Sequence, residues 1–199
     1  MTSFADDLLS ALRSLRQSRR FLPTPVAQED LERLLEVARW TGSAKNSQPW
    51  HLVVVTDAKM NAQLAGCGDF AGFLDGVAAS IVVAVEGQGR AVAYDDGRLQ
   101  ERVMLAAAAL GIGSGTAWFS STESRQRVRN LLGIPAHLEP WSAIGLGYTD
   151  TTQAQAAPQL SGRKPIEDIT SWGRYGEKAK GHLTAVQTSG RAVRSAGPA

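Results

Sequence analysis

Five polar side chains crowd into one short connection of this chain. They are Ser43, Lys45, Asn46, Ser47 and Gln48. An apolar helical stretch ends just before them, near Trp40, and a run of apolar, mostly β-branched residues follows them at 52–55. A connection between two buried elements usually needs only a few turn residues. This segment has more hydrogen-bonding capacity than a turn requires, so we interpret it as a binding loop.

The side chains that most often carry catalysis are scattered. The three histidines have no metal-ligand spacing, and Cys67 is the only cysteine, so the sequence predicts no dedicated metal site. Ser114 does not form a nucleophile elbow, because Ile112 stands where the first glycine would be required. An enzyme built on this chain would therefore need a bound cofactor to carry its chemistry.

Glycines gather at 111–115, but this segment follows a predicted helix and not a strand. The phosphate-binding loops of Rossmann and P-loop proteins have a strand before the glycines and a helix after them. The glycines suit either a close-packed turn or a backbone that approaches a ligand. Both interpretations remain open at this point.

Arginines lie at two places that could bind a phosphate. The first group lies on or just after the first predicted helix, and Arg163 with Lys164 forms a second basic point. The first group is Arg13, Arg16, Arg19 and Arg20. Guanidinium groups suit phosphate, although a solvated helix face is the alternative. Acidic residues at 29–36 would repel a nucleic-acid backbone, so a single phosphate on a small molecule is favoured.

Composition indicates a soluble globular protein with a real core. Of the 199 residues 43% are hydrophobic and 20% are charged, and the formal net charge is +2. Two aspartates precede the first basic residue, which is not typical of a secretory signal, and no apolar run is long enough for a bilayer span. The sequence predicts a cytoplasmic protein that binds neither a membrane nor nucleic acid.

The hydrophobic pattern predicts alternating helices and strands. Helices are expected at 3–20, 27–40, 57–64, 94–110 and 122–132, and strands at 52–55, 81–85, 116–119 and 141–146. This order favours a layered α+β or α/β fold. Residues 150–162 are expected to form a linker or extended arm, and the last fifteen or so a frayed tail.

Several motifs follow one another in an order that is typical of one family. They are Arg-Gln-Ser-Arg-Arg-Phe at 16–21, Ser-Ala-Lys-Asn-Ser-Gln-Pro-Trp at 43–50, Asp-Gly-Arg at 96–98, the stretch 105–113, Gly-Leu-Gly-Tyr at 145–148 and Arg-Lys-Pro-Ile-Glu-Asp-Ile at 163–169. The Asn-x-Gln-Pro-Trp element is the most specific. Over residues 8–175 the chain resembles the nitroreductase family of FMN-dependent oxidoreductases.

The resemblance implies an α+β homodimer with a central, mainly antiparallel sheet flanked by helices and an extended C-terminal arm. It implies one domain at 1–175, a tail at 176–199, and an FMN at each subunit interface. NADH or NADPH would reduce the flavin, which would then reduce a small planar acceptor such as a nitroaromatic or quinone by ping-pong hydride transfer. The alternative is a flavin- or nucleotide-binding module without turnover.

The resemblance also assigns cofactor contacts by position. The FMN phosphate would be held by Arg16, Gln17, Arg19 and Arg163. The ribityl chain and ring would lie along Ser43, Ala44, Asn46 and Gln48, partly from the partner subunit. The backbone of Gly115, Thr116, Ala117 and Trp118 would pass close to the flavin ring. No catalytic side chain is assigned, because the flavin carries the chemistry.

The phosphate contacts depend on the alignment of the first motif. The family pattern Arg-Arg-Ser-x-Arg-x-Phe, aligned on Phe21 without a gap, gives Arg16, Gln17 and Arg19. A one-residue gap would instead use Arg16, Ser18 and Arg20. The prolines that follow at positions 23 and 25 favour the ungapped alignment.

Two roles are possible for each of the tryptophans and for Lys45. Trp40, Trp50 and Trp118 would exclude water near the flavin, or would pack in the core or an interface. Lys45 is either a surface charge or a neighbour of the flavin ring.

Overall fold

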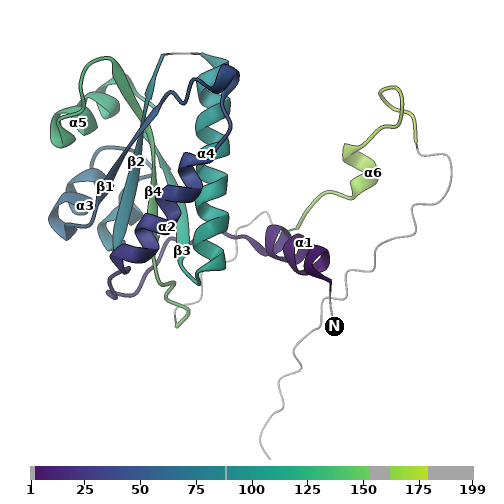
Figure 1. The fold of residues 1–199 in the computed structure, drawn as a ribbon, viewed down its shortest axis with the longest axis horizontal. Helices are drawn as coiled ribbons and strands as arrows, with labels where there is room; N and C mark the ends of the chain where they lie inside the picture. The colour runs from purple at the N-terminus through teal and green to yellow at the C-terminus, as the bar shows by residue number, and fades with distance from the viewer. Residues whose placement is uncertain (1–2, 88, 153–161, 179–199) are drawn as a thin grey trace, which may run out of the picture. The chain divides into compact units, whose positions relative to one another are not determined.

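The computed structural model describes residues 3–87, 89–152 and 162–178 of the chain (Figure 1). The chain divides into two compact units, residues 1–153 and 154–199. Most of the predicted linker and the whole of the predicted frayed tail lie outside the described residues. A single domain at 1–175 with a tail at 176–199 stays a prediction.

A four-stranded antiparallel sheet forms the centre of the first unit. Its strands are β1 (Trp50–Val55), β2 (Ala79–Glu86), β3 (Gly113–Trp118) and β4 (Leu138–Gly147), in the order β1-β2-β4-β3. Every neighbouring pair is antiparallel. The predicted antiparallel sheet is therefore confirmed, and β3 is an edge strand whose outer backbone groups are open to other partners.

Helices cover both faces of this sheet (Figure 1). On one face Ile81, Val83 and Val85 of β2 pack with α2 (Gln28–Arg39) and α4 (Arg90–Ala109). On the other face Val82 and Ala84 pack with α3 (Ala58–Ala65), the short helix η2 (Gly72–Gly76) and α5 (Thr122–Leu132). Because both faces are buried, residues 81–85 of β2 form a continuous apolar run without polar alternation.

The helix predictions at 27–40, 57–64 and 122–132 are confirmed to within one or two residues at each end. Side-chain caps at Asp57 and Ser121 explain two of these sharp starts. The long helix α4 begins at Arg90, four residues before its predicted start. Gly113 and Gly115, predicted as part of a helix-breaking turn, lie within β3, which ends at Trp118, one residue before its predicted end.

The prediction of a helix at 3–20 was wrong in its last third, at 15–20. Helix α1 (Phe4–Ser14) begins with a capping box of Ser3 and Asp6 and ends at Ser14. The next residues follow the edge of β3, where the Ser18 N–H donates to the Ser114 carbonyl (2.7 Å). Because the backbone finds partners on the sheet, it leaves the helix, and Arg16, Arg19 and Arg20 do not share a helix face.

Two further short helices complete the described residues. They are η1 (Ala44–Asn46) and α6 (Ile166–Ile169). Helix η1 lies in the connection at 43–48, which we call the polar loop, and α6 lies in the second unit. No helix in the described part of the chain is long and apolar enough to cross a membrane.

Candidate functional site

A pocket of about 500 Å³ lies at the outer edge of β3. It is lined by Gln17, Arg19, Phe70, Gly72, Phe73, Thr116 and Trp118, and we call it the β3-edge pocket. The Gln17 side chain takes the place of a neighbouring strand: its Oε1 accepts from the Thr116 N–H (3.3 Å) and its Nε2 donates to Thr116 Oγ1 (3.2 Å). The edge of the sheet thus fixes the segment after α1 against the pocket.

Arg19 provides the positive charge of this pocket. Its guanidinium lies 4.2 Å from the centre of the Phe73 ring and donates to Gln17 Oε1 (2.6 Å). Partial desolvation lowers the pKa of the Arg19 guanidinium, which nevertheless stays charged at neutral pH. No carboxylate among the described residues lies within ion-pair distance of it. A cation in this position is suited to an anionic ligand.

Gly115 allows this close arrangement. A Cβ atom at Gly115 would collide with Arg19 Nη1 and with the Ser18 carbonyl oxygen. Any other residue would therefore displace Arg19 or the segment after α1. The glycine keeps the guanidinium close to the strand, and this is a close approach of the kind for which proteins use glycine.

The outer edge of β3 continues past Thr116 to Trp118. Backbone groups alternate in direction along a strand, and those of Ser114 and Thr116 point outward to Ser18 and Gln17. The Trp118 N–H, two residues further, therefore points to the same side. The backbone groups of Gly115 and Ala117 point toward β4 instead. The Trp118 side chain is 45% exposed and borders the pocket.

The polar loop lies in a second pocket of about 420 Å³. We call it the loop pocket, and it is lined by Ser43, Ala44, Arg90, Ala91, Tyr94, Asp95 and Arg98. The Ala44 N–H donates to Oδ2 of the buried Asp95 (3.2 Å), and the Gln48 N–H donates to Ser43 Oγ (2.8 Å). The first bond holds the loop to α4, and the second joins two residues of the loop.

Three residues of this loop adopt a left-handed backbone. The φ angles of Lys45, Asn46 and Gln48 are 54°, 55° and 48°. Residues with a side chain rarely adopt this conformation, which is found where surrounding structure holds it and often at functional sites. The side chains of these three residues are exposed.

A third pocket of about 340 Å³ lies between the other two. We call it the tryptophan pocket, and it is lined by Gly89, Arg90, Val92, Ala93, Asp96, Trp118 and Trp141. It shares Trp118 with the β3-edge pocket and Arg90 with the loop pocket. Burial raises the pKa of the Asp96 carboxyl to about 6, although hydrogen bonds from Ser142 and Gln100 act to lower it.

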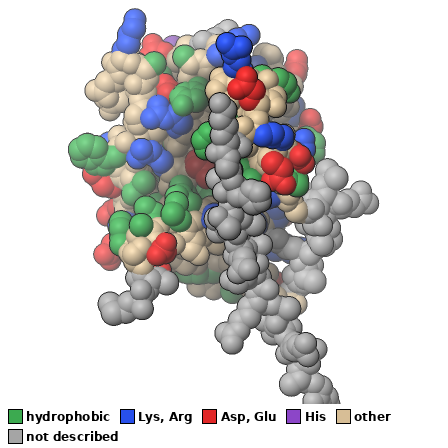
Figure 2. All heavy atoms as spheres, turned by 90° about the vertical axis from the view of Figure 1, so that its right-hand side faces the viewer, with side chains coloured by type: hydrophobic (Ala, Val, Ile, Leu, Met, Phe, Trp, Pro, Cys, Tyr) green, Lys and Arg blue, Asp and Glu red, His purple; other side chains and the backbone are tan. Residues whose placement is uncertain are grey.

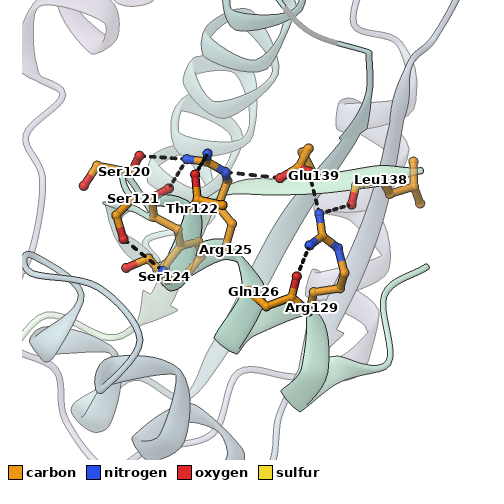
Figure 3. A network of polar contacts seen from close by, with 10 residues as sticks. Ser120, Ser121, Thr122, Ser124, Arg125, Gln126, Arg129, Leu138 and Glu139 are labelled. Atoms are coloured by element: carbon orange, nitrogen blue, oxygen red, sulfur yellow. Dashed lines mark hydrogen bonds and ion pairs between the residues drawn. The ribbon is translucent and has the colours of Figure 1, made fainter. Parts of the chain in front are cut away.

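A network of arginines fixes the turn that follows β3 (Figure 3). Arg125 Nη1 donates to the carbonyls of Phe119 (3.2 Å) and Ser120 (2.7 Å), and its Nε pairs with Glu139 (3.1 Å). Glu139 also accepts from Arg129 (2.5 Å). The Arg125 guanidinium lies 4.3 Å from the centre of the Trp141 ring. The network therefore ties the turn after β3 to Glu139 of β4 and places Arg125 against Trp141 of the same strand.

The structure brings together four of the predicted cofactor contacts, namely Gln17, Arg19, Thr116 and Trp118. Ser43 and Ala44 lie apart from them in the loop pocket. The Arg16 guanidinium bonds to the carbonyls of Arg13 (2.9 Å) and Leu15 (2.7 Å), outside the three pockets. Arg163 belongs to the second unit, where it is exposed and bonds to the Gly162 carbonyl (3.2 Å).

Ser18, the alternative phosphate contact, points away from the β3-edge pocket. Its side chain is buried, with Oγ 2.7 Å from Thr149 Oγ1. The choice between the two alignments stays a prediction.

The three tryptophans that were predicted to lie near the flavin occupy different environments. Trp40 is 68% exposed, its indole N–H donates to Glu36 Oε1 (2.8 Å), and it lines none of the three pockets. Trp50 packs against the core between the sheet and α2 and α4. Only Trp118 of the three borders the pocket in which the cofactor was expected.

Sequence reasoning did not predict several of the residues that line these pockets, among them two phenylalanines, an aspartate and a tryptophan. Phe70 and Phe73 come from the glycine-rich stretch at 66–76, whose structure the pattern did not predict. Asp96 and Trp141 lie on α4 and β4 and meet only in the folded chain. Asp96 is buried on α4 beside two other polar residues, Asp95 and Gln100, and a buried carboxyl requires hydrogen-bond partners.

Comparison with known proteins gives the family. A model described as "Nitroreductase family" matches residues 12–67. The chain is 32% identical over 149 residues to a protein of Archaeoglobus fulgidus named "Putative NADH dehydrogenase/NAD(P)H nitroreductase". That alignment covers 72% of this chain and 86% of the relative. The chain therefore belongs to the nitroreductase family.

Solved structures share the fold. An FMN-dependent nitroreductase from Clostridium difficile R20291 superposes with a TM-score of 0.74 at 20% identity, covering 84% of this chain and 99% of that one. An NADPH:FMN oxidoreductase from Vibrio harveyi in complex with NAD+ gives 0.72 at 20% identity, covering 87% and 80%. At this identity the likeness concerns the fold alone.

Proposed function

We propose that this NAD(P)H-dependent flavin oxidoreductase binds FMN in the β3-edge pocket and reduces a planar acceptor such as a nitroaromatic or quinone. One observation carries the proposal. The unpaired cation Arg19 and the outward-facing edge of β3 lie in one pocket of a chain of the nitroreductase family. The pocket thus offers a charge for a phosphate and a strand edge for a planar ring.

The phosphate is held by Arg19 and Gln17, and the assignment of Arg16 and Arg163 to it stays a prediction. Arg19 fits this role because no carboxylate of the described residues neutralises it. Gln17 Nε2 and the Arg19 guanidinium are both hydrogen-bond donors, which suits a phosphate, whose oxygens only accept hydrogen bonds. Each charge-assisted hydrogen bond to a phosphate contributes roughly 1.5–3 kcal/mol.

The flavin ring lies along the outer edge of β3. The Trp118 N–H is free to donate to a ring nitrogen, which would tune the electron affinity of the cofactor. When bound, FMN supplies the hydride chemistry between nicotinamide and acceptor. The protein binds and orients it, and Trp118 and Phe73 keep water from the ring. No side-chain acid or base is required of the chain.

A bound flavin would react with the donor and the acceptor in turn, in a ping-pong sequence. The names of related proteins, which include an NAD(P)H nitroreductase and an NADPH:FMN oxidoreductase, support the nicotinamide donor and the flavin cofactor. NADH and NADPH are both candidates for the donor. A flavin- or nucleotide-binding module without turnover is the alternative that the first experiment must separate.

The protein acts as a homodimer with FMN at the subunit interface. Helix α1 has no buried residue, and its apolar side chains Phe4, Leu8, Leu9 and Leu12 are 84%, 49%, 57% and 45% exposed. Figure 2 views the molecule from the side of α4 and shows exposed hydrophobic side chains among arginines and lysines. A second subunit would cover such surfaces.

The position of the polar loop supports the same assembly. The loop pocket shares no residue with the β3-edge pocket. Ser43, Ala44, Asn46 and Gln48 therefore contact the FMN of the partner subunit. The two pockets belong to two different active sites of the dimer.

The colour of the purified protein provides the test. A yellow protein that bleaches on anaerobic addition of NADH or NADPH, and regains its colour with a nitroaromatic or quinone, supports the oxidoreductase. A yellow protein that does not bleach favours the binding module. A colourless protein that takes up no added FMN contradicts both. Initial rates at varied donor and acceptor concentrations should give the parallel double-reciprocal lines of a ping-pong sequence.

A further inference from the structure

The tryptophan pocket lies beside the β3-edge pocket and is not needed to hold the cofactor. Val92 and Ala93 from the first turn of α4 form one side, and Trp118 and Trp141 from β3 and β4 form another. Cavities of about 150 Å³ already admit benzene. A pocket of about 340 Å³ can therefore hold one substituted aromatic ring.

Asp96 gives this mostly apolar pocket a buried polar group. It is only 1% exposed, and its carboxyl accepts from Ser142 Oγ (3.0 Å to Oδ1, 3.2 Å to Oδ2) and from Gln100 Nε2 (3.0 Å to Oδ2). An ionised carboxylate has about four lone-pair positions. These bonds leave Oδ1 able to accept a further hydrogen bond from a ligand in the pocket.

The Trp141 side of the pocket is held in place by an arginine that packs against it. Trp141 lies against the Arg125 guanidinium, which is itself fixed by Glu139 and by the carbonyls of Phe119 and Ser120 (Figure 3). A fixed indole offers an aromatic ligand an edge-to-face or offset-stacked partner without loss of its own freedom. Arg90 adds a positive charge to the lining, which suits the oxygens of a nitro group.

We propose that the tryptophan pocket binds single-ring aromatic acceptors that carry a hydroxyl or amino group, such as nitrophenols and nitroanilines. The O–H or N–H group donates to Asp96, and the ring lies against Trp118 and Trp141. Trp118 borders both pockets, so the ring is held next to the place where FMN binds. The inference rests on the proposed function for its substrate class, because it selects among the acceptors of that reaction.

Isothermal titration calorimetry of the purified protein at neutral pH tests the polar contact. The ligands are meta-nitrophenol and meta-nitroanisole, which differ by the methyl group that replaces the hydroxyl proton. We expect meta-nitrophenol to bind about tenfold more tightly, because its analogue leaves the Asp96 lone pair unsatisfied. In Asp96→Asn, which lacks the charge but keeps the shape, the preference should fall to about twofold or less.

A pair of substitutions on α4 tests the location. Ala93 and Ala108 are both exposed, but Ala93 lines the tryptophan pocket and Ala108 lines none of the three pockets. We expect Ala93→Phe to weaken meta-nitrophenol binding at least about tenfold, and Ala108→Phe to leave it unchanged. Equal affinity for the two ligands in the wild type overturns the proposal, and so does wild-type binding by Ala93→Phe.

Failure of this proposal can be told from failure of the proposed function. Flavin content and bleaching by NADH or NADPH are measured on the same preparations. A protein that retains FMN and bleaches, but does not discriminate between the two ligands, contradicts the tryptophan pocket alone. A protein that neither contains FMN nor takes up added FMN contradicts the proposed function, while the comparison of the two ligands still decides what the pocket binds.

Discussion

Arg19 differs from the nearby arginines in its contacts and not in its chemistry. Several arginines lie in the same stretch, but Arg16 bonds to carbonyls of its own segment, whereas Arg19 reaches the β3-edge pocket over Phe73. The difference arises because the chain leaves the helix at Ser14 and follows β3, which places Gln17 and Arg19 on one side and Ser18 on the other.

Replacing Arg19 with alanine should weaken FMN binding about 10- to 100-fold, since a charge-assisted bond of roughly 1.5–3 kcal/mol is lost. Equilibrium dialysis of FMN against the purified protein measures this. Arg33→Ala is the matched control, because Arg33 pairs with Asp30 on the exposed side of α2. If both variants bind FMN like the wild type, Arg19 does not hold the phosphate.

Asp96 should make folding stability depend on pH. Its pKa in the folded protein is raised to about 6 from the ordinary 3.8, so the folded state binds the proton more tightly than the unfolded chain. This contribution is fully present below about pH 4 and is lost as the pH rises through about 6. The difference corresponds to on the order of 3 kcal/mol.

Urea unfolding at a series of pH values between about 4 and 7 measures this loss of stability. Asp96→Asn should flatten the dependence over that range, because the amide does not titrate. Asp30→Asn, on the surface of α2, serves as the control. An unchanged slope in Asp96→Asn would assign the dependence to other groups.

At the scale of elements, the sequence predicted those elements that have local signals and did not predict the segment that is held by a distant strand. The helices α2, α3 and α5 were predictable because each has an apolar stripe, and α3 and α5 also have side-chain caps, all of which are local signals. The extended path of residues 15–20 was not predictable from its arginine spacing, because a strand nearly 100 positions away holds it.

The same distinction applies to the candidate site. The residues of the loop and of β3 were found through motifs that are continuous in sequence. Asp96 and Trp141 were missed because they come from different elements, and only the antiparallel pairing of β3 with β4 brings Trp141 close to Trp118. The position of Arg163 relative to the first unit stays a prediction.

Backbone strain in the polar loop should be measurable. Lys45 has a φ of 54°, which glycine adopts without penalty, so Lys45→Gly should stabilise the protein by about 1 kcal/mol. The matched control is Lys59→Gly within α3, which should destabilise it by about 1 kcal/mol. Urea unfolding gives both values. A destabilised Lys45→Gly would show that the lysine side chain contributes more than the backbone conformation costs.

At the scale of the whole molecule, the contacts within a single subunit do not account for the stability of helix α1. A helix with a complete capping box but no buried residue gains little from its own chain. Isolated helices of this length are marginal in water, so α1 needs an apolar partner to be stable. The proposed second subunit would supply it and would also bring the polar loop to the flavin.

Disruption of this surface should therefore affect assembly and cofactor together. We expect Leu9→Glu combined with Leu12→Glu to convert a dimer of the 21.2 kDa chain into a monomer and to weaken FMN binding at least about tenfold, because Ser43 and Ala44 of the partner subunit are lost with it. Light scattering coupled to gel filtration gives the mass, and dialysis gives the FMN affinity. Val37→Glu, an exposed apolar position on α2, should change neither. A double variant that stays dimeric would place the interface elsewhere, and a monomer with full FMN affinity would show that one subunit suffices to hold the flavin.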